Sequence, residues 1–161
     1  MIHKLNIILI SVAFLAASCS SQKQATGLGQ QNPASGLKVE MEQAAATATK
    51  DSLMITFTVI NDTDKPLRFV KWETPFEPRL GKYFEIKGTD GNEAVFKGAM
   101  ARRVMPPPPE AYMEVKAHDR IKTTIDLSDY YTINEGSYEI NYVGGGVSGL
   151  IAPNGIAVII K

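Results

Sequence analysis

Apolar and polar residues alternate with a period of two through most of this chain, and this alternation is the feature that most restricts its fold. One such run extends over residues 37–41 and the next over residues 53–59. Each run places every second side chain on an apolar face. This spacing is typical of β-strands that bury one face, whereas an amphipathic helix needs apolar residues three and four positions apart. The pattern therefore predicts a sheet protein.

Further short segments carry the same signal, and turn-forming residues separate them. Helix signals are weak, because 44–50 is too short to be stable by itself and 128–133 has room for one turn. About eight or nine short strands in sequence predict an all-β fold, an antiparallel immunoglobulin-like β-sandwich. The additional strands are expected at 67–73, 83–87, 94–97, 113–115, 121–127, 138–142 and 156–160.

Two turns predict hairpins between neighbouring strands. Residues 61–66 read NDTDKP, and such residues favour turns because their side chains bond to nearby backbone or fix φ. Residues 89–92 read TDGN, whose Asp-Gly pair tolerates the positive φ of a tight hairpin turn. We therefore expect the two strands that flank each turn to pair with one another.

Two aromatic positions match the immunoglobulin-like pattern. The segment from Asn134 to Tyr138 is similar to the tyrosine corner of such domains, and Trp72 falls at the end of the third expected strand, where these folds bury a tryptophan. We expect both aromatic side chains to lie in the core. The glycine cluster 144–146 lacks the Lys-Ser/Thr of a phosphate-binding loop and predicts a flexible connection before the last strand.

The N-terminus has the features of an export signal. A cationic head, residues 1–4, precedes an apolar run over 5–17, which is too short to span a membrane as a helix. The run ends with the residues LAASC, which resemble the lipobox of bacterial lipoproteins. This resemblance implies a signal peptide at 1–18 and lipidation of Cys19. Ordinary cleavage that leaves a free thiol is the alternative.

Lipidation would attach the mature chain to a membrane, because more than one acyl chain on Cys19 anchors a protein stably. Ser20 follows the cysteine, whereas lipoproteins retained at the inner membrane usually carry Asp there, so the resemblance implies the outer membrane of a cell that has one. The Gln-, Gly- and Ser-rich stretch up to Gly36 predicts a flexible tether. The expected organisation is therefore the signal at 1–18, lipidated Cys19 and tether at 19–36, and the sandwich at 37–161.

Charge and residue inventory argue against several functions. The 17 Lys and Arg residues balance 17 Asp and Glu residues, so there is no basic excess of the kind that binds nucleic acid. One Cys and two His residues leave too few groups for a disulfide framework, a zinc site or a catalytic triad with Ser148. The turn carboxylates at 62–64 and 90–93 are explained by the turns themselves. We expect no catalytic residue, metal or cofactor, and an enzyme is the least favoured class.

Two loops contain more than a sandwich requires. Residues 72–81 read WETPFEPRLG, and residues 98–112 read GAMARRVMPPPPEAY. Met, Arg and aromatic side chains are enriched at binding surfaces, and prolines reduce the entropy lost when a loop is ordered. A rigid polyproline crossover between sheets is the alternative interpretation of the second loop. The candidate partner-binding residues are Phe76, Glu77, Arg102, Arg103 and Met105.

Three segments occur in the order and spacing of one known family. They begin at Ile60 (INDTDKPLRFVKWETPFE), Lys97 (KGAMARRVMPPPPEAY) and Ile125 (IDLSDYYTINEGSYEINY). Together they resemble the N-terminal prodomain of bacterial deuterolysin-like, aspzincin-type metalloendopeptidases, over about 37–143. The resemblance implies a small all-β domain that keeps a zinc protease latent, although this chain has no His-Glu-x-x-His. His118 stands in a turn where family members tend to carry Gly.

The resemblance implies a lipid-anchored relative of that prodomain, which inhibits a secreted or envelope zinc metalloendopeptidase or keeps it latent. In this hypothesis Arg102 and Arg103 reach an acidic, Lys-selecting subsite. Phe76 acts as a hydrophobic anchor and Glu77 as a contact at the rim. The competing hypothesis is a non-catalytic envelope lipoprotein that displays its loops to another surface protein or to a glycan.

Overall fold

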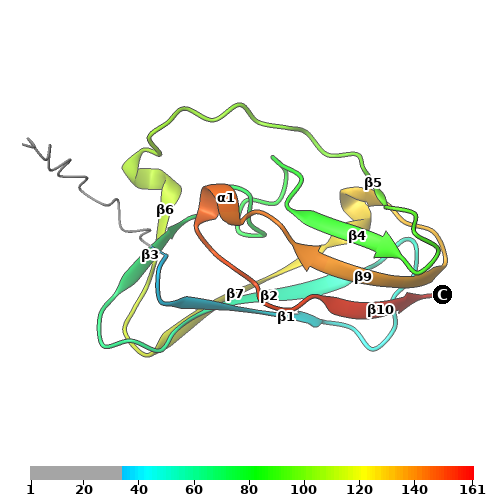
Figure 1. The fold of residues 1–161 in the computed structure, drawn as a ribbon, viewed down its shortest axis with the longest axis horizontal. Coiled ribbons are helices and arrows are strands. Elements are labelled where there is room, and N and C mark those ends of the chain that lie inside the picture. Colours follow the sequence, from blue (N-terminus) through cyan, green and yellow to red (C-terminus); the bar gives the residue numbers. More distant parts are fainter. Residues whose placement is uncertain (1–33) are drawn as a thin grey trace, which may run out of the picture. The chain divides into compact units, whose positions relative to one another are not determined.

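The computed structural model describes residues 34–161, and the predicted signal peptide, Cys19 and most of the predicted tether lie outside the described residues. The described part contains ten strands, all paired antiparallel, with two short 3₁₀ helices and one four-residue α-helix (Figure 1). The predicted all-β, sandwich-like class is confirmed. Within residues 34–161 no helix is long and apolar enough to cross a membrane.

The elements follow the predicted segments closely, with one strand more than expected. The additional strand, β8, has two residues, which is too few for an alternating pattern to be recognised. The elements are β1 (Leu37–Gln43), β2 (Met54–Asn61), β3 (Leu67–Val70), β4 (Phe84–Gly88), β5 (Val95–Phe96), η1 (Pro109–Ala111), β6 (Tyr112–Val115), β7 (Asp119–Asp126), η2 (Leu127–Asp129), β8 (Tyr131–Thr132), β9 (Gly136–Tyr142), α1 (Gly145–Ser148) and β10 (Ile156–Ile160).

Two three-stranded sheets supply most of the core. One has the order β1-β2-β7 and the other the order β10-β9-β4, while β3-β6 and β5-β8 form two smaller pairs. The inward side of β2 carries Phe57, whose ring lies 5.0 Å from that of Tyr142 on β9. Tyr142 in turn lies 6.0 Å from Phe84 on β4. Because burial of apolar area dominates the stability of such domains, this aromatic cluster joins the layers.

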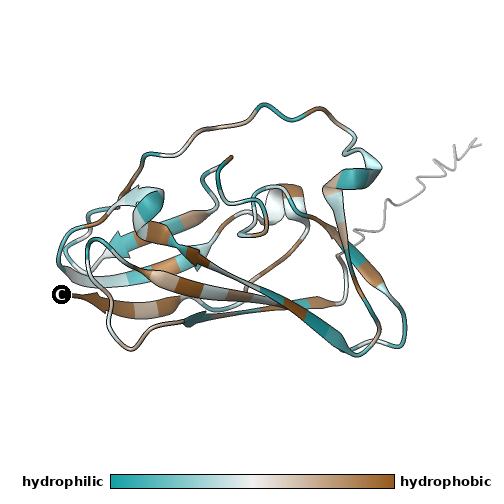
Figure 2. Cartoon of the chain, turned by 180° about the vertical axis from the view of Figure 1, so that it is seen from behind, coloured by the Kyte–Doolittle hydropathy of each residue, from teal (hydrophilic) through white to brown (hydrophobic). Residues whose placement is uncertain are grey.

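β10 shows how the alternation operates in the second sheet. Val158 and Ile160 are buried, whereas Ile159 between them is 65% exposed. The strand ends at the marked C-terminus in Figure 2, where its apolar colouring is visible. The first described residue also belongs to the folded part: Ala34 is buried in the core and its carbonyl oxygen accepts a bond from Leu37 N–H. Ala34, which falls within the predicted tether, is therefore packed against the domain, while Ser35 and Gly36 are exposed.

The predicted hairpin between the second and third strands does not form. β3 pairs with β6, because β1 and β7 already occupy both edges of β2. The intervening turn is organised by buried Asn61, whose Nδ2 donates to the carbonyl oxygens of Lys65, Val115 and Lys116. The turn thus directs the chain to the β6 side of the domain. It does not return the chain along β2.

The predicted hairpin at the TDGN turn forms beside the turn, where Lys87 pairs with Glu93 and Ala94 N–H donates to the Ile86 carbonyl oxygen at 2.9 Å. Gly88 N–H donates to the Asn92 carbonyl oxygen at 2.8 Å, and Gly91 adopts a φ of 84°, as an Asp-Gly turn requires. Beyond Ala94 the chain leaves β4: β5 pairs with β8, and β4 pairs with β9. The turn signal therefore located the reversal correctly, but the hairpin pairing that it predicted is short, and β4 pairs along its length with β9.

Two further predictions are corrected. The tyrosines whose hydroxyl groups bond to distant backbone are Tyr131 and Tyr142, while Tyr138 is half-buried and its hydroxyl group has no hydrogen bond within residues 34–161. The glycine cluster is also not a flexible connection. A Cβ on Gly144 would lie 2.0 Å from the carbonyl oxygen of Glu73, so the cluster allows two backbones to pack closely before α1 begins.

Candidate partner-binding surface

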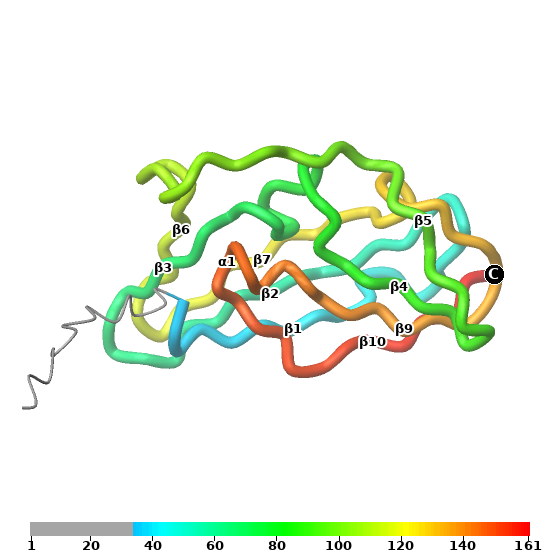
Figure 3. Tube along the Cα trace, turned by 45° about the horizontal axis from the view of Figure 1, so that its top comes forward, coloured from blue at the N-terminus to red at the C-terminus, as the bar shows by residue number. Residues whose placement is uncertain are grey.

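The second predicted loop forms a long strap, here defined as residues 98–109, which connects β5 to η1 (Figure 3). Backbone pairing between Leu80 and Ala99 holds its start, and the bond from Lys71 N–H to the Ala111 carbonyl oxygen holds the chain just beyond its end. Between these points, the backbone groups of residues 100–107 make no hydrogen bond with any part of residues 34–161. The strap is therefore attached at its ends and unpaired along its middle.

One side chain attaches the middle of the strap to the rest of the domain. The Arg103 guanidinium group lies over the indole ring of Trp72, 4.8 Å from the ring centroid. Its Nη2 atom forms an ion pair with Glu77 and approaches the Leu80 carbonyl oxygen at 3.5 Å. The Arg103 and Glu77 side chains are only 18% and 24% exposed. We call Trp72, Glu77 and Arg103 the clasp.

A partly buried cation held in this way is stabilised by both partners. Cation-π contact with a tryptophan and an ion pair are each stronger when water is partly excluded. The Arg103 Nε atom is buried and has no hydrogen-bond partner within residues 34–161. In the clasp, Arg103 therefore binds side chains of its own domain, Glu77 and Trp72, and holds the strap against them.

Phe76 is partly buried and packs against the core of the domain. Its ring lies 6.3 Å from Phe57 and 5.6 Å from Phe69. A tight turn positions it: the Thr74 hydroxyl group donates to the Lys71 carbonyl oxygen at 2.6 Å and accepts from Phe76 N–H at 3.2 Å. The structure therefore assigns this side chain to packing.

The same loop is fixed from its other side by β9. The Tyr142 hydroxyl group donates to the carbonyl oxygen of Glu73 at 3.0 Å and contacts the hydroxyl group of buried Ser148 at 2.7 Å. Glu73 adopts a left-handed conformation with φ of 54°, which costs energy in a residue with a side chain. Burial raises the pKa of the Tyr142 phenol above its usual value, so it is protonated at neutral pH. Ser148 accordingly has a structural role.

The outer side of the strap is the part that remains available to a partner. Arg102 is exposed, and neither an ion pair nor a hydrogen bond engages it within residues 34–161. Met100, Val104 and Met105 are 68%, 79% and 66% exposed. Exposed apolar side chains beside a free cation are the residue types that binding surfaces favour. Two of the five candidate residues, Arg102 and Met105, are exposed. The other three contact side chains of the same domain: Phe76, Glu77 and Arg103.

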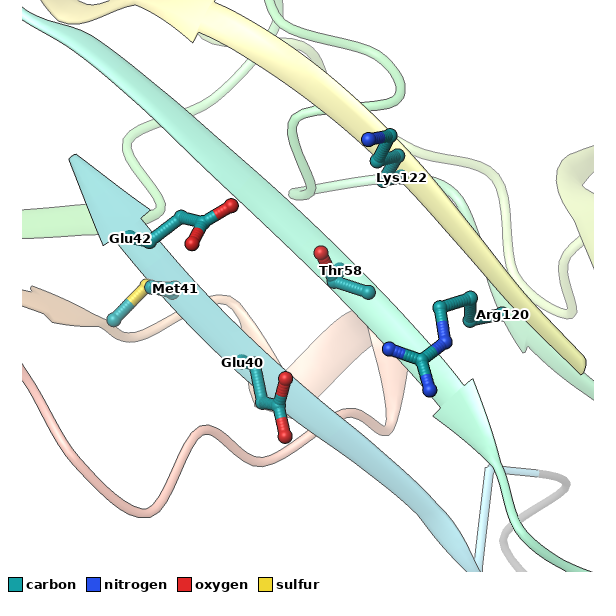
Figure 4. A pocket seen from close by; sticks show the side chains of 6 residues that line it. All are labelled: Glu40, Met41, Glu42, Thr58, Arg120 and Lys122. Carbon is teal, nitrogen blue, oxygen red and sulfur yellow. The ribbon is translucent and has the colours of Figure 1, made fainter. Parts of the chain in front are cut away.

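A second surface feature lies on the outer face of the β1-β2-β7 sheet, and the loop composition gave no hint of it. Figure 4 shows Glu40 and Glu42 on β1 facing Arg120 and Lys122 on β7 across Thr58. The shallow depression between them has a volume of about 380 Å³. The outward positions of both strands carry these charges at every second residue, which is the sequence signal for such a face.

The turn carboxylates at 62–64 and 90–93 take part in local bonds. Asp62 forms an ion pair with Lys38, and that lysine lowers the pKa of the Asp62 carboxyl group through a hydrogen bond and its charge. Asp90 accepts bonds from the backbone and side chain of Asn92, which lower its pKa. Within residues 34–161 no three His, Cys, Asp or Glu side chains are grouped as a metal site would require.

The strands described above define an all-β domain with an exposed strap. In comparisons with known proteins, the chain matches two distant relatives, both of them secreted or extracellular. The chain is 28% identical over 98 residues to an uncharacterized secreted protein of Arthroderma benhamiae, a match that covers 59% of this chain and 50% of that protein. It is 27% identical over 94 residues to an extracellular protease of Aeromonas hydrophila, covering 58% of this chain and 26% of the protease. No family model matches the chain.

The chain thus spans half the length of one curated relative and about a quarter of the other. A distant relationship to secreted proteins, one of them a protease, is what these matches establish. The similarity covers only part of each relative, so it concerns a shared segment.

Proposed function

We propose that this chain is a non-catalytic, lipid-anchored envelope protein that inhibits an extracellular zinc metalloendopeptidase or keeps it latent. The observation that carries the proposal is the distant similarity to an extracellular protease, because the matched segment makes up only about a quarter of that protein. We therefore infer that the shared segment is a domain that acts on a protease and is not the catalytic part of one. The chain's two His residues and single Cys offer little for catalysis.

The geometry of the strap supports a binding role and narrows the candidate residues. Arg102 is the cation that remains free to enter an acidic subsite, and Met105 is the apolar candidate beside it. Phe76, Glu77 and Arg103 support the strap from within. An interface built on a pre-ordered loop loses less conformational entropy on binding, which favours tight association.

The location of the relatives supports an extracytoplasmic protein. Lipidation of Cys19 and the outer membrane as its site are the finer parts of the proposal. Lipid anchoring is tested by expressing the full chain and its Cys19→Ser variant in a Gram-negative bacterium. We expect labelled fatty acid and membrane association in the parent chain and neither in the variant. Equal membrane association of both chains would contradict lipid anchoring at this residue.

Inhibition is tested by titrating the full chain, purified in detergent, against the Aeromonas hydrophila extracellular protease and against a Lys-preferring aspzincin-type metalloendopeptidase. Several fixed enzyme concentrations are used. We expect saturable loss of activity at near-stoichiometric amounts of the chain. Full activity of both enzymes in the presence of folded chain would contradict the proposal. That result would favour the alternative of an envelope protein that displays loops to another surface protein or a glycan.

A further inference from the structure

We propose that the strap is the segment that enters the protease cleft, with Arg102 in the specificity subsite, and that the clasp keeps the strap bound even when its Arg102–Arg103 bond is cut. This inference rests on the proposed function and specifies how the inhibitor engages its target. Three features of the strap support it. The backbone is unpaired, Arg102 is exposed while Arg103 is held by other side chains, and the strap is attached on both sides of the Arg102–Arg103 peptide bond.

The backbone of the strap offers what an extended ligand needs. The backbone C=O groups of residues 100–107 and the N–H groups of residues 100–105 have no partners within residues 34–161, so they are available to a second molecule. Proteins bind extended peptides by adding them as a strand, with backbone hydrogen bonds supplying affinity and side-chain pockets supplying specificity. An unpaired segment attached at both ends meets this description without any rearrangement of the sheets.

The two adjacent arginines have opposite surroundings. Arg102 is exposed and free, whereas the Arg103 side chain is 18% exposed and held by Glu77 and Trp72. A protease subsite selective for cations can therefore accept the first without disturbing the second. The exposed Met100 and Met105 extend the contact on either side with apolar, adaptable side chains. The fixed φ angles of the prolines at 106–109 limit the freedom of the strap before it binds.

The clasp explains why such a strap would inhibit a protease instead of serving as an ordinary substrate. Hydrolysis of the Arg102–Arg103 peptide bond adds one water molecule and leaves a carboxylate on Arg102 and an amine on Arg103. The Arg103 side chain remains on Glu77 and Trp72, and the Leu80–Ala99 pairing holds the other new end. Both ends then stay near the cleft at high effective concentration, which slows the release of the cut chain.

The test compares the full chain with three variants against both proteases named above. Arg102→Ala removes the exposed cation, Glu77→Gln weakens the clasp, and Lys116→Ala is a control that removes an exposed cation outside the strap. Thermal melts monitored by circular dichroism confirm that each variant is folded. Inhibition constants are measured at early times, and inhibition and cleavage at the 102–103 bond are then followed over hours by activity and mass spectrometry.

We expect Arg102→Ala to weaken inhibition at least 10-fold and Lys116→Ala to leave it unchanged. We expect Glu77→Gln to inhibit at first and then lose inhibition as the strap is cut and released, several-fold faster than in the parent chain. If the parent chain inhibits and Arg102→Ala inhibits equally well, the strap assignment is wrong while the proposed function stands. If Glu77→Gln is cut and released at the parent rate, the role of the clasp is wrong.

Failure of the proposed function gives a different result, because the parent chain then inhibits neither protease. That outcome also overturns the strap assignment. If Glu77→Gln does not fold, Trp72→Phe replaces it, since phenylalanine keeps an apolar ring beside Arg103 and provides a weaker cation-π partner. A smaller increase in the release rate is then expected. Release at the parent rate would again contradict the clasp.

Discussion

The hydroxyl group of Tyr131 bonds to both backbone groups of Phe84, donating to the carbonyl oxygen at 2.8 Å and accepting from the N–H at 3.2 Å. The two residues lie 47 positions apart, and the contact joins β8 to the start of β4. We expect Tyr131→Phe to lower the free energy of unfolding by about 1 kcal/mol, the usual net value of a buried hydrogen bond. Urea denaturation monitored by circular dichroism measures this change.

Tyr138→Phe is the matched control for that substitution. Its hydroxyl group has no hydrogen bond within residues 34–161, although this tyrosine occupies the position that resembles a tyrosine corner. We expect little change in stability. A larger loss for Tyr138→Phe than for Tyr131→Phe would show that the sequence resemblance, and not the observed bond, identifies the important hydroxyl group.

Gly144→Ala is expected to destabilise the domain by about 1–3 kcal/mol or more, because extra atoms in a packed site force the backbone to shift. The added Cβ would lie 2.0 Å from the Glu73 carbonyl oxygen and 2.8 Å from the Tyr142 hydroxyl oxygen. Gly146→Ala is the control, since its Cβ would meet nothing within 4 Å. Thermal denaturation distinguishes the two, and equal melting temperatures would contradict the close approach of the two backbones.

The acid stability of the domain should depend on Asp126. Burial alone would raise the pKa of this carboxyl group, but bonds from Ser128 and from the backbone N–H of Leu53 outweigh burial and lower the pKa. A carboxyl group with a pKa below its unfolded value stabilises the fold above that unfolded value, and the stability is lost as the pH falls through the folded pKa. We therefore expect the loss to begin below about pH 4.

Asp126→Asn should reduce stability at neutral pH, since a neutral amide oxygen is a weaker acceptor than the carboxylate for the bonds from Ser128 and Leu53. It should also flatten the decline in stability between neutral and acid pH. Exposed Asp129, which follows in the same short helix, provides the control variant Asp129→Asn. Denaturant titrations at pH 3, 4 and 7 measure both effects, and an unchanged acid slope in Asp126→Asn would count against this assignment.

The clasp has its own optical reporter, because Trp72 is the single tryptophan of the chain. Arg103→Ala removes the cation from the indole face and opens the site to water, so we expect the emission to shift to longer wavelength. Arg102→Ala leaves the contact intact and should not alter the spectrum. Identical spectra for Arg103→Ala and the parent chain would mean that the two side chains do not stack in solution.

Most strands were predictable from the sequence, and most of their pairings were not. The alternation at 53–59 identified the buried face of β2, because a period of two distinguishes the two sides of a strand. It contains no information on whether β2 bonds to β3 or to β1 and β7, since a strand has two edges with the same backbone groups. The turn at 61–66 was consistent with a hairpin, and buried Asn61 gives it another role.

For the candidate site, too, the sequence predicted one part and only the structure showed the rest. Loop composition pointed to the strap and to the loop at 72–81, and both lie together in the structure. Composition did not reveal that Phe76 packs on Phe57 and Phe69, because a loop aromatic between prolines has the same local sequence whether it faces the core or a partner. The charged face of the β1-β2-β7 sheet was not predicted. The charges of β1 and those of β7 lie on one face only because both strands pair with β2, and local sequence does not show this pairing.

By itself the sequence determined that this chain forms a β domain, where its strands lie and which of its faces are apolar, since these follow from local spacing and turn chemistry. Only the tertiary structure decided that one arginine of an adjacent pair is clasped and the other is free. That distinction depends on Trp72 and Glu77, which lie more than twenty residues before Arg103. Contacts of this kind arise from chain crossing and packing, which the local pattern does not encode.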